Sequence, residues 1–367
     1  MKRIFQAIAI IALVVCFAER SNALTESPQE VMQRIDKNMH RFVVKVYAAE
    51  VKEDAEPALS SGSGWLVRTQ DGTARIISNA HVVGQATHVY VQFDGEPFAH
   101  KVQVLGVDPL VDIALLATPN PLTRFAIPLP LAALPAHVGD PVYAIGYPSG
   151  ARTISYGLVV SETSALAQSS GFDLFFSHQA PIAPGSSGGA LVRYSALTTA
   201  YPLALEFVGM NTAVAVSKSE NAKTIGNIGY SLHARVVDLL LPKLEAERTV
   251  SHARIGWQIA DTERVNPYWF ELKLKGQYPP EKSGVVVLRI APDSPAARAG
   301  MLAGDTIVKF EVGSEERWVT IPFTHAGELA EVTFFKLAPG TRVRVSTERG
   351  TQKLGREMVL EPYVLGK

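Results

Sequence analysis

The sequence contains almost no cysteine and carries no net charge, and both absences exclude classes of function. One cysteine, Cys16, occurs among 367 residues. It lies in an apolar N-terminal segment, so a chain without this segment has no thiol for a disulfide, a zinc–cysteine site or a nucleophile. The 35 basic and 35 acidic residues cancel, so nothing favours a nucleic acid or an acidic membrane as partner. No H-E-x-x-H motif occurs either, and we expect neither a metal nor a cofactor.

The N-terminus has the layout of a secretory signal peptide. Lys2 and Arg3 precede an apolar run from Ile4 to Ala18, and small residues follow up to Ala23. An uncleaved membrane anchor is the alternative, but the run of about 15 residues is shorter than the roughly 20 that a spanning helix needs. We therefore expect cleavage after Ala23 and a periplasmic or secreted mature chain.

The rest of the chain is long and apolar enough, at 47% hydrophobic residues, for two or three folded units. Between Phe42 and about Val237, short apolar runs such as FVVKVYA and HVYVQF alternate with Gly, Pro, Asn and Asp. This pattern favours an antiparallel sandwich or barrel over βαβ units. The proline-rich stretch 117–141 predicts an extended connection between two β halves. Helical patterns at 26–39 and 231–247 bound the region.

A second unit is expected after the polar, unpatterned residues 247–252. From about Arg254 to Tyr363, strand patterns such as SGVVVLRI and TRVRVST mix with helical segments such as DSPAARAGM. This mixture predicts an α+β domain joined to the first unit by a short linker.

The stretch APIAPGSSGGALV places two serines among three glycines, and nucleophilic chemistry distinguishes them. A serine hydroxyl attacks a carbonyl only with an imidazole base, an orienting carboxylate and backbone N–H groups that hold the oxyanion. In one arrangement these donors belong to the nucleophile and to the residue two before it. For Ser186 that residue is Pro184, which has no N–H. For Ser187 it is Gly185, which also tolerates positive φ. A simple glycine-rich turn is the alternative.

Upstream residues supply candidates for the base and the carboxylate. In the stretch ARIISNAHVV, an apolar strand pattern ends just before His81. An imidazole at this place can project from a rigid element. PLVDIALLA sets Asp112 in an apolar run, and a buried carboxylate needs a fixed donor such as an imidazole N–H. A satisfied surface or core histidine and a backbone cap are the alternatives. Together with Ser187, the two residues predict a His-Asp-Ser triad.

These motifs make the chain resemble the HtrA/Deg family of trypsin-like serine proteases that carry a C-terminal PDZ domain. SGSGWLV, ISNAHVV, DIALL, AIGYPSG, APGSSGGALV, VGMNTAVA and GNIGYSL occur in family order over roughly residues 30–245. The resemblance implies a mainly β fold, with two six-stranded, chymotrypsin-like barrels and the active site between them. It assigns His81 as general base, Asp112 as orienter and Ser187 as nucleophile. The N–H groups of Gly185 and Ser187 would form the oxyanion hole.

The resemblance also organises the domains. The predicted parts are a signal peptide at 1–23, a trypsin-like serine protease domain at 24–246, a linker at 247–252 and a PDZ domain at 253–363. RIGWQI resembles the carboxylate-binding loop of PDZ domains, so Ile255, Gly256 and Trp257 are expected to bind C-terminal peptides. The resemblance suggests a homotrimer held by the N-terminal part of the protease domain, although an ordinary first strand explains HRFVVKVYA equally well.

The chain departs from the family pattern at several places. Ser186 stands before the nucleophile, where the family usually has Asn. Gln179 and Pro181 replace a more usual Asp and Ala beside the specificity pocket. Pro181 also occupies the place of the acid in Lys- or Arg-specific enzymes, and Ile182 is apolar, which predicts small or medium aliphatic side chains before the cut. EVGSEERWVTIPFT replaces the tight turn usual in PDZ domains, and NPYWFELKLKGQYPPEK has no counterpart.

Two functions from different classes fit these observations. The first is a serine endopeptidase of the cell envelope that cuts unfolded or damaged proteins through an acyl-enzyme. The second is a catalytically silent, chaperone-like binding protein that acts through its PDZ domain. The intact set of His81, Asp112, Ser187 and Gly185 favours the first. An α/β-hydrolase is disfavoured because its histidine follows the serine, and no histidine in a matching context does so here.

Overall fold

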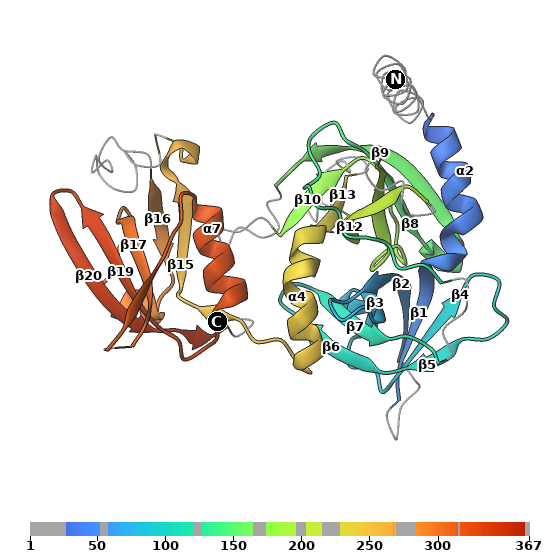
Figure 1. The fold of residues 1–367 in the computed structure, drawn as a ribbon, viewed down its shortest axis with the longest axis horizontal. Coiled ribbons are helices and arrows are strands. Elements are labelled where there is room, and N and C mark those ends of the chain that lie inside the picture. The colour runs from blue at the N-terminus through green and yellow to red at the C-terminus, as the bar shows by residue number, and fades with distance from the viewer. Residues whose placement is uncertain are drawn as a thin grey trace, which may run out of the picture. The chain divides into compact units, whose positions relative to one another are not determined.

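The computed structural model describes residues 27–51, 58–120, 126–163, 174–195, 203–214, 228–266, 268, 284–314 and 316–363. The predicted signal peptide and nearly all of the aromatic insertion lie outside these residues. Within the described ranges, no helix has the length and apolar character needed to cross a membrane. The chain divides into two compact units whose main boundary lies between Arg248 and Thr249, and residues 163–175 are grouped with the second unit (Figure 1).

The first unit begins with helix α2 (Pro28–Asn38), which has a capping box between Ser27 and Glu30 and buries one face through Val31 and Ile35. A seven-stranded antiparallel sheet follows, in the order β5-β4-β1-β2-β3-β7-β6. Its strands are β1 (Val43–Glu50), β2 (Ala58–Arg68), β3 (Ala74–Ser78), β4 (His88–Phe93), β5 (His100–Val102), β6 (Val104–Asp108) and β7 (Ile113–Ala117). Its end strands β5 and β6 do not pair with each other in the described chain, so this half is a curled half-barrel, not a six-stranded barrel.

The second half of this unit is a closed barrel of six strands, in the order β10-β13-β12-β11-β8-β9. The strands are β8 (Pro141–Gly146), β9 (Thr153–Ser161), β10 (Phe175–His178), β11 (Ala190–Tyr194), β12 (Leu205–Val214) and β13 (Gly229–His233). Across the two halves, Trp65 stacks on Phe207 with ring centroids 3.6 Å apart. The mainly β, chymotrypsin-like fold is confirmed.

Helix α4 (Ala234–Ala246) closes the first unit along β6 and β7 (Figure 1). It buries Val236, Leu240 and Leu244, one face at helical spacing. Gly106 of β6 lies directly under it, because a Cβ there would stand 2.1 Å from the Leu244 carbonyl oxygen. A glycine in β6 therefore permits the close approach of helix and sheet.

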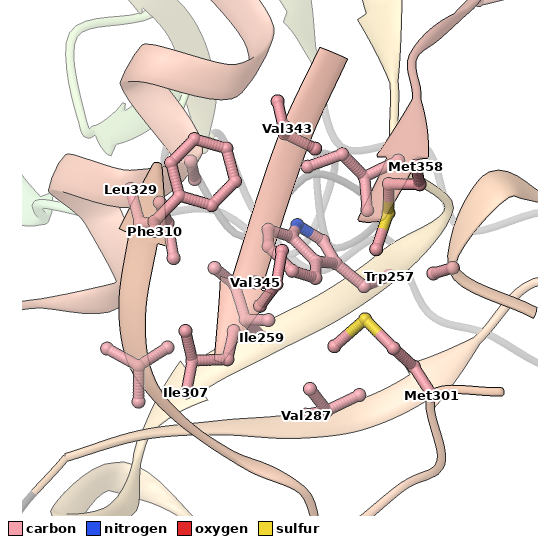
Figure 2. Packing of buried hydrophobic residues seen from close by; sticks show 14 of the residues in the cluster. Trp257, Ile259, Val287, Met301, Ile307, Phe310, Leu329, Val343, Val345 and Met358 are labelled. Atoms are coloured by element: carbon pink, nitrogen blue, oxygen red, sulfur yellow. The ribbon is translucent and has the colours of Figure 1, made fainter. Parts of the chain in front are cut away.

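The second unit is a β/α domain. Its main sheet has the order β15-β16-β17-β19-β20, with β18 paired to β17, and β14 pairs with β21. The elements are β14 (Ala253–Arg254), β15 (Trp257–Asp261), β16 (Val285–Ile290), α6 (Pro295–Arg298), β17 (Thr306–Gly313), β18 (Trp318–Ile321), α7 (Ala326–Glu331), β19 (Arg342–Arg349), β20 (Gln352–Val359) and β21 (Glu361–Pro362). Trp257, Phe310, Leu329 and Val345 meet in its core (Figure 2). Strand β15 ends the path of paired strands.

Candidate active site

His81 lies in a single helical turn, α3 (Ala80–Val83), directly after β3. Val82 and Val83 are buried in the core of the first sheet. The His81 side chain remains 52% exposed. A rigid strand end thus presents the imidazole to solvent, where it can meet a substrate.

Asp112 holds His81 twice. Its Oδ2 lies 2.8 Å from His81 Nδ1, and its Oδ1 accepts the His81 backbone N–H at 2.9 Å. The hydrogen bond to this carboxylate raises the pKa of His81, and partial burial opposes that effect. Asp112 has φ 65°, in the left-handed region that non-glycine residues rarely adopt. Such strain persists only where surrounding contacts enforce it, which is common at functional sites.

Asn79 connects this pair to the strand beside Ser187. Its Nδ2 donates to the Asp112 carbonyl at 2.7 Å and to Thr212 Oγ1 at 3.3 Å. The Ser187 hydroxyl donates to the Thr212 carbonyl at 3.3 Å. In the described part of the chain, Ser187 has no hydrogen bond to His81. Catalytic hydrogen bonds are often loose in free enzymes and tighten with substrate.

The backbone before Ser187 directs the N–H of Gly185 away from the neighbouring segment at Ser149. The Pro184 carbonyl accepts the Ser149 N–H at 3.2 Å. In a trans peptide the N–H points opposite to the carbonyl, so the Gly185 N–H points away from Ser149. Gly185 has φ 98°, and a Cβ there would lie 2.8 Å from the Tyr147 carbonyl oxygen. Only glycine satisfies both conditions.

The N–H of Ser187 is directed in the same way. The Ser186 carbonyl accepts the Gly189 N–H at 2.9 Å, so the Ser187 N–H points away from Gly189. The Ser186 hydroxyl accepts the Ala183 N–H at 3.2 Å. Over the residues that the structure describes, neither Gly185 nor Ser187 donates its N–H to a protein acceptor. The loop therefore offers two backbone donors that suit an oxyanion.

A second histidine–serine contact lies inside the closed barrel. His178 Nε2 is 3.1 Å from Ser231 Oγ, and Ser231 Oγ donates to Asn211 Oδ1 at 3.2 Å. All three residues are fully buried. Burial lowers the pKa of His178 to about 4, so the ring is neutral at pH 7. Substrate cannot reach this contact.

Asp108 is the buried aspartate nearest in sequence to Asp112. Its Oδ1 accepts the N–H groups of Leu110 and Val111, each at 3.1 Å. These bonds shape the turn between β6 and β7. Asp108 belongs to the first sheet and His178 to the closed barrel. Asp112, in contrast, is bonded directly to His81. His178 contacts Ser231, which is bonded to the side-chain amide of Asn211.

The predicted pocket residues lie on the segment before Ser187. Pro181 is exposed, and its carbonyl accepts the Ser155 hydroxyl at 2.5 Å. Ile182 is partly buried against the barrel core. A Cβ on Gly229 would lie 3.1 Å from Ile182 Cδ1 and 2.5 Å from a ring carbon of His178. Ile182 is thus part of an apolar wall backed by a neutral histidine.

In the second unit, Ile255, Gly256 and Trp257 line a cavity of about 780 Å³ together with Arg254, Arg289, Phe334 and Tyr363. The side chains of Ile255 and Trp257 are buried in the core, as Figure 2 shows for Trp257. Gly256 has φ 87°, and its carbonyl accepts the Ala291 N–H at 2.7 Å. These residues therefore face the cavity mainly with backbone.

Sequence reasoning did not find Asn79, Thr212 or Asn211, which connect the elements around Ser187. Each lies inside a motif quoted above, but a single polar residue near a strand end gives no sign of its partner. Asn211 holds the loop after Ser187, since its carbonyl accepts the Gly188 N–H and its N–H donates to the Gly189 carbonyl. Its place in the chain could not indicate these bonds.

Known proteins resemble both units. A family model described as trypsin-like peptidase domain matches residues 62–196. The chain is 32% identical over 251 residues to "Periplasmic serine endoprotease DegP" of Escherichia coli (strain K12), which covers 68% of this chain and 48% of DegP. It is 27% identical over 326 residues to "Serine endoprotease DegS" of the same organism, covering 88% of this chain and 83% of DegS. The chain thus spans about half the length of DegP.

Two solved structures share the fold. "HtrA-type protease AlgW with tripeptide" superposes with a TM-score of 0.63 at 22% identity, over 91% of this chain and 97% of that chain. "Crystal structure of the serine endoprotease from Yersinia pestis" superposes with a TM-score of 0.57 at 23% identity, over 92% of this chain and 100% of that chain. At these identities the likeness is one of fold.

Proposed function

Because the chain belongs to the HtrA/Deg family of trypsin-like serine proteases, we propose that it is a serine endopeptidase that uses His81, Asp112 and Ser187. The observation that carries this proposal is the doubly bonded His81–Asp112 pair beside a loop with two unengaged backbone donors. Histidine, carboxylate and oxyanion donors are the parts that acyl transfer to serine needs.

In the proposed reaction, the Ser187 hydroxyl turns from the Thr212 carbonyl toward His81 Nε2. His81 takes the proton as Ser187 Oγ bonds to the peptide carbonyl, and Asp112 stabilises the resulting imidazolium. The N–H groups of Gly185 and Ser187 hold the oxyanion. His81 then protonates the leaving amine as the peptide C–N bond breaks. Water, activated by His81, hydrolyses the acyl-enzyme and restores Ser187.

A catalytically silent binding protein is the competing proposal. Such a protein would need the protease fold and the second unit, but it would not need His81, Asp112 and Ser187 in a catalytic arrangement. The strained φ of Asp112 and its two bonds to His81 favour the enzyme, since a silent site has no need to maintain strain.

The proposed substrates are unfolded or damaged proteins of the cell envelope. The relatives named above include a periplasmic endoprotease, which supports this compartment. Ile182 and Pro181 bring no charge to the pocket region, so a Lys or Arg side chain would lose hydration without a partner. We expect Val, Ala, Leu, Ile or Thr before the cut. Mass spectrometry of casein digests tests this preference, and a dominance of Lys and Arg would refute it.

The proposed domains are a protease domain at 24–246, a linker at 247–252 and a PDZ domain at 253–363, and the boundary between Arg248 and Thr249 supports this division. A C-terminal peptide would add a strand to β15 while N–H groups of Ile255, Gly256 and Trp257 hold its carboxylate. Amidating the terminus of a bound peptide should weaken binding at least tenfold, and equal affinity would dismiss this mode. A homotrimer is the proposed assembly, which native mass spectrometry can test.

The deciding experiment incubates the chain from Leu24 with unfolded casein. Ser187→Ala should abolish cleavage because it removes the attacking oxygen, at a cost of several orders of magnitude in turnover. Ser186→Ala is the matched control, since it removes a neighbouring hydroxyl that only accepts the Ala183 N–H. Equal loss in both variants would refute the assignment, and absence of cleavage by the unmodified chain would favour the silent protein.

A further inference from the structure

Apart from the pairing of β1 with β2, Ser63 of β2 makes four hydrogen bonds within the described residues, and two of them reach the loop of the proposed nucleophile. Its N–H donates to the Ser187 carbonyl at 2.8 Å, and its hydroxyl donates to the Gly185 carbonyl at 2.7 Å. The same hydroxyl accepts the Tyr147 N–H at 2.8 Å. The Ser63 carbonyl accepts the Ser78 hydroxyl at 2.8 Å. One fully buried residue of the first sheet thus joins two segments of the barrel.

The two bonds to the loop act on alternate peptide planes. The plane from Gly185 to Ser186 is held by the Ser63 hydroxyl, and the plane from Ser187 to Gly188 is held by the Ser63 N–H. Between them lies the plane that carries the Ser187 N–H. Rotating a peptide plane changes the dihedral angles on both sides. Fixing the two outer planes therefore restricts the orientation of the inner one.

Of the two bonds, the one from the Ser63 hydroxyl restricts the loop more, because Gly185 has no side chain that would limit its backbone angles. A glycine visits both signs of φ at little cost, so a neighbouring peptide plane can rotate where a bulkier residue would resist. The Ser63 hydroxyl opposes this rotation by holding the Gly185 carbonyl inward. It also holds the Tyr147 N–H, in the segment against which Gly185 packs.

We infer that Ser63 is a positioning residue whose hydroxyl keeps the Gly185 and Ser187 N–H groups aimed at the oxyanion. The inference rests on the proposed endopeptidase function. Ser63 does not touch His81 or Asp112 through any bond that the structure gives, so its effect on catalysis is confined to the loop. It would lower the energy of the transition state, where negative charge develops, more than that of bound substrate.

The test is Ser63→Ala, with peptide cleavage measured per active site. We expect kcat to fall roughly tenfold to hundredfold, which is no more than the fall caused by removing one oxyanion donor. KM should change less than about twofold. Affinity for a peptide aldehyde, which forms an oxyanion on Ser187, should fall by the same factor as kcat/KM. The pH inflection due to His81 should stay in place. An unchanged kcat, or a shifted inflection, would overturn the inference.

Thr69→Val is the matched control for the loss of a buried hydroxyl, because Thr69 directly follows β2. Thr69 Oγ1 contacts Asp71 and the Thr73 carbonyl inside the turn between β2 and β3. Removing it should lower stability by about 1 kcal/mol and leave kcat and aldehyde affinity unchanged. A matching loss in this variant would show that general destabilisation explains the effect of Ser63→Ala.

Gly146→Ala is a second test, which should move the Ser63 hydroxyl without removing it. A Cβ at this position would stand 2.8 Å from Ser63 Oγ and 3.3 Å from Ser186 Cα, so it would press on the hydroxyl first and on the loop itself second. The new methyl should displace the hydroxyl and reproduce the loss of kcat with little change in KM. Normal kcat in a folded Gly146→Ala protein would contradict the inference.

A final measurement separates this inference from the proposed function. Hydrogen exchange of residues 183–191 is compared between Ser187→Ala and Ser63→Ala/Ser187→Ala, neither of which needs to cleave anything. Faster exchange in this segment alone supports the positioning role, whatever the unmodified chain does to casein. Unchanged exchange overturns it, even if the chain proves to be a protease.

Discussion

Two histidine–serine sites lie in the first unit, and they differ in everything except residue type. His81 is half exposed and bonded twice to a carboxylate, and the Ser187 hydroxyl nearby donates to the Thr212 carbonyl. His178 is buried, and it contacts a serine that is bonded to an amide. The first can accept and release a proton beside a substrate. The second is buried and stays neutral at pH 7, so a histidine–serine contact by itself does not identify an active site.

The two histidines also respond in opposite directions to their surroundings. The carboxylate of Asp112 raises the pKa of His81, whereas desolvation lowers the pKa of His178 to about 4. Charge partner and burial are separate causes of such shifts. Five predictions test how far this difference determines function, and they run from the largest expected effect to the smallest.

The largest effect is expected from replacing the carboxylate of the exposed site. Asp112→Asn should lower kcat by about 10⁴-fold because the amide favours the wrong tautomer of His81. Asp108→Asn is the matched control in the same turn, since Asp108 accepts two backbone N–H groups there. It should keep kcat within about threefold. Steady-state cleavage of a peptide substrate decides between them, and a comparable loss in both variants would contradict the assignment of Asp112.

The second prediction concerns the pH dependence of cleavage. Neutral His81 is the proposed base, so kcat/KM should fall about tenfold per pH unit below its pKa. Because Asp112 raises that pKa, the inflection should lie above the ordinary value of 6.5. NMR titration of histidine ring carbons checks this directly, with His81→Gln to identify the signal. An inflection below 6.5 would mean that the carboxylate does not dominate.

The third prediction concerns stability at acid pH. Folded His178 stays neutral down to about pH 4, whereas an unfolded histidine binds a proton near pH 6.5. Unfolding therefore takes up a proton between these values, and the free energy of unfolding falls as pH drops through this window, by up to roughly 3 kcal/mol. Urea unfolding at pH 7 and pH 5 should show a smaller difference in His178→Gln. His233, whose pKa burial also lowers to about 4, should account for part of the remaining difference, which His233→Gln can separate.

The fourth prediction is a small effect from the buried serine. Ser231→Ala removes one hydroxyl between His178 and Asn211, which should cost about 1 kcal/mol of stability. Turnover should change less than about threefold, because this hydroxyl lies in the closed barrel away from substrate. Thermal unfolding and cleavage assays measure the two quantities. A turnover as low as that of Ser187→Ala would exchange the roles of the two sites.

The smallest effect is expected at the N-terminus. Digestive trypsin-like zymogens become active when a new terminal ammonium pairs with an Asp before the nucleophile. The corresponding Ser186 is neutral and accepts the Ala183 N–H, and an ammonium buried beside it would have no compensating charge. A chain with several extra residues before Leu24 should be as active as one that starts there. Activity that depends on trimming would refute this.

The sequence indicated much of the exposed site because each of its parts has a local signature. A strand that ends before His81, a carboxylate within an apolar run and glycines around a serine all follow from short-range rules. Pro184 also helped, because a proline has no backbone N–H and therefore argues against Ser186 as the nucleophile. The sequence predicted two closed barrels, but only one β half is closed. Closure depends on pairing between strands far apart in the chain, which local patterns do not indicate.

By itself, the sequence therefore predicted the β architecture, the need for a glycine at position 185 and the candidate reactive residues, because backbone freedom and apolar patterning are local properties. The tertiary structure alone decided that Asp112 reaches His81 twice, that Asn79 joins them to Thr212, and that Ser63 holds the loop from the opposite sheet. It also separated His178 from solvent. Each of these depends on the register and packing of distant strands, which set distances that no single segment encodes.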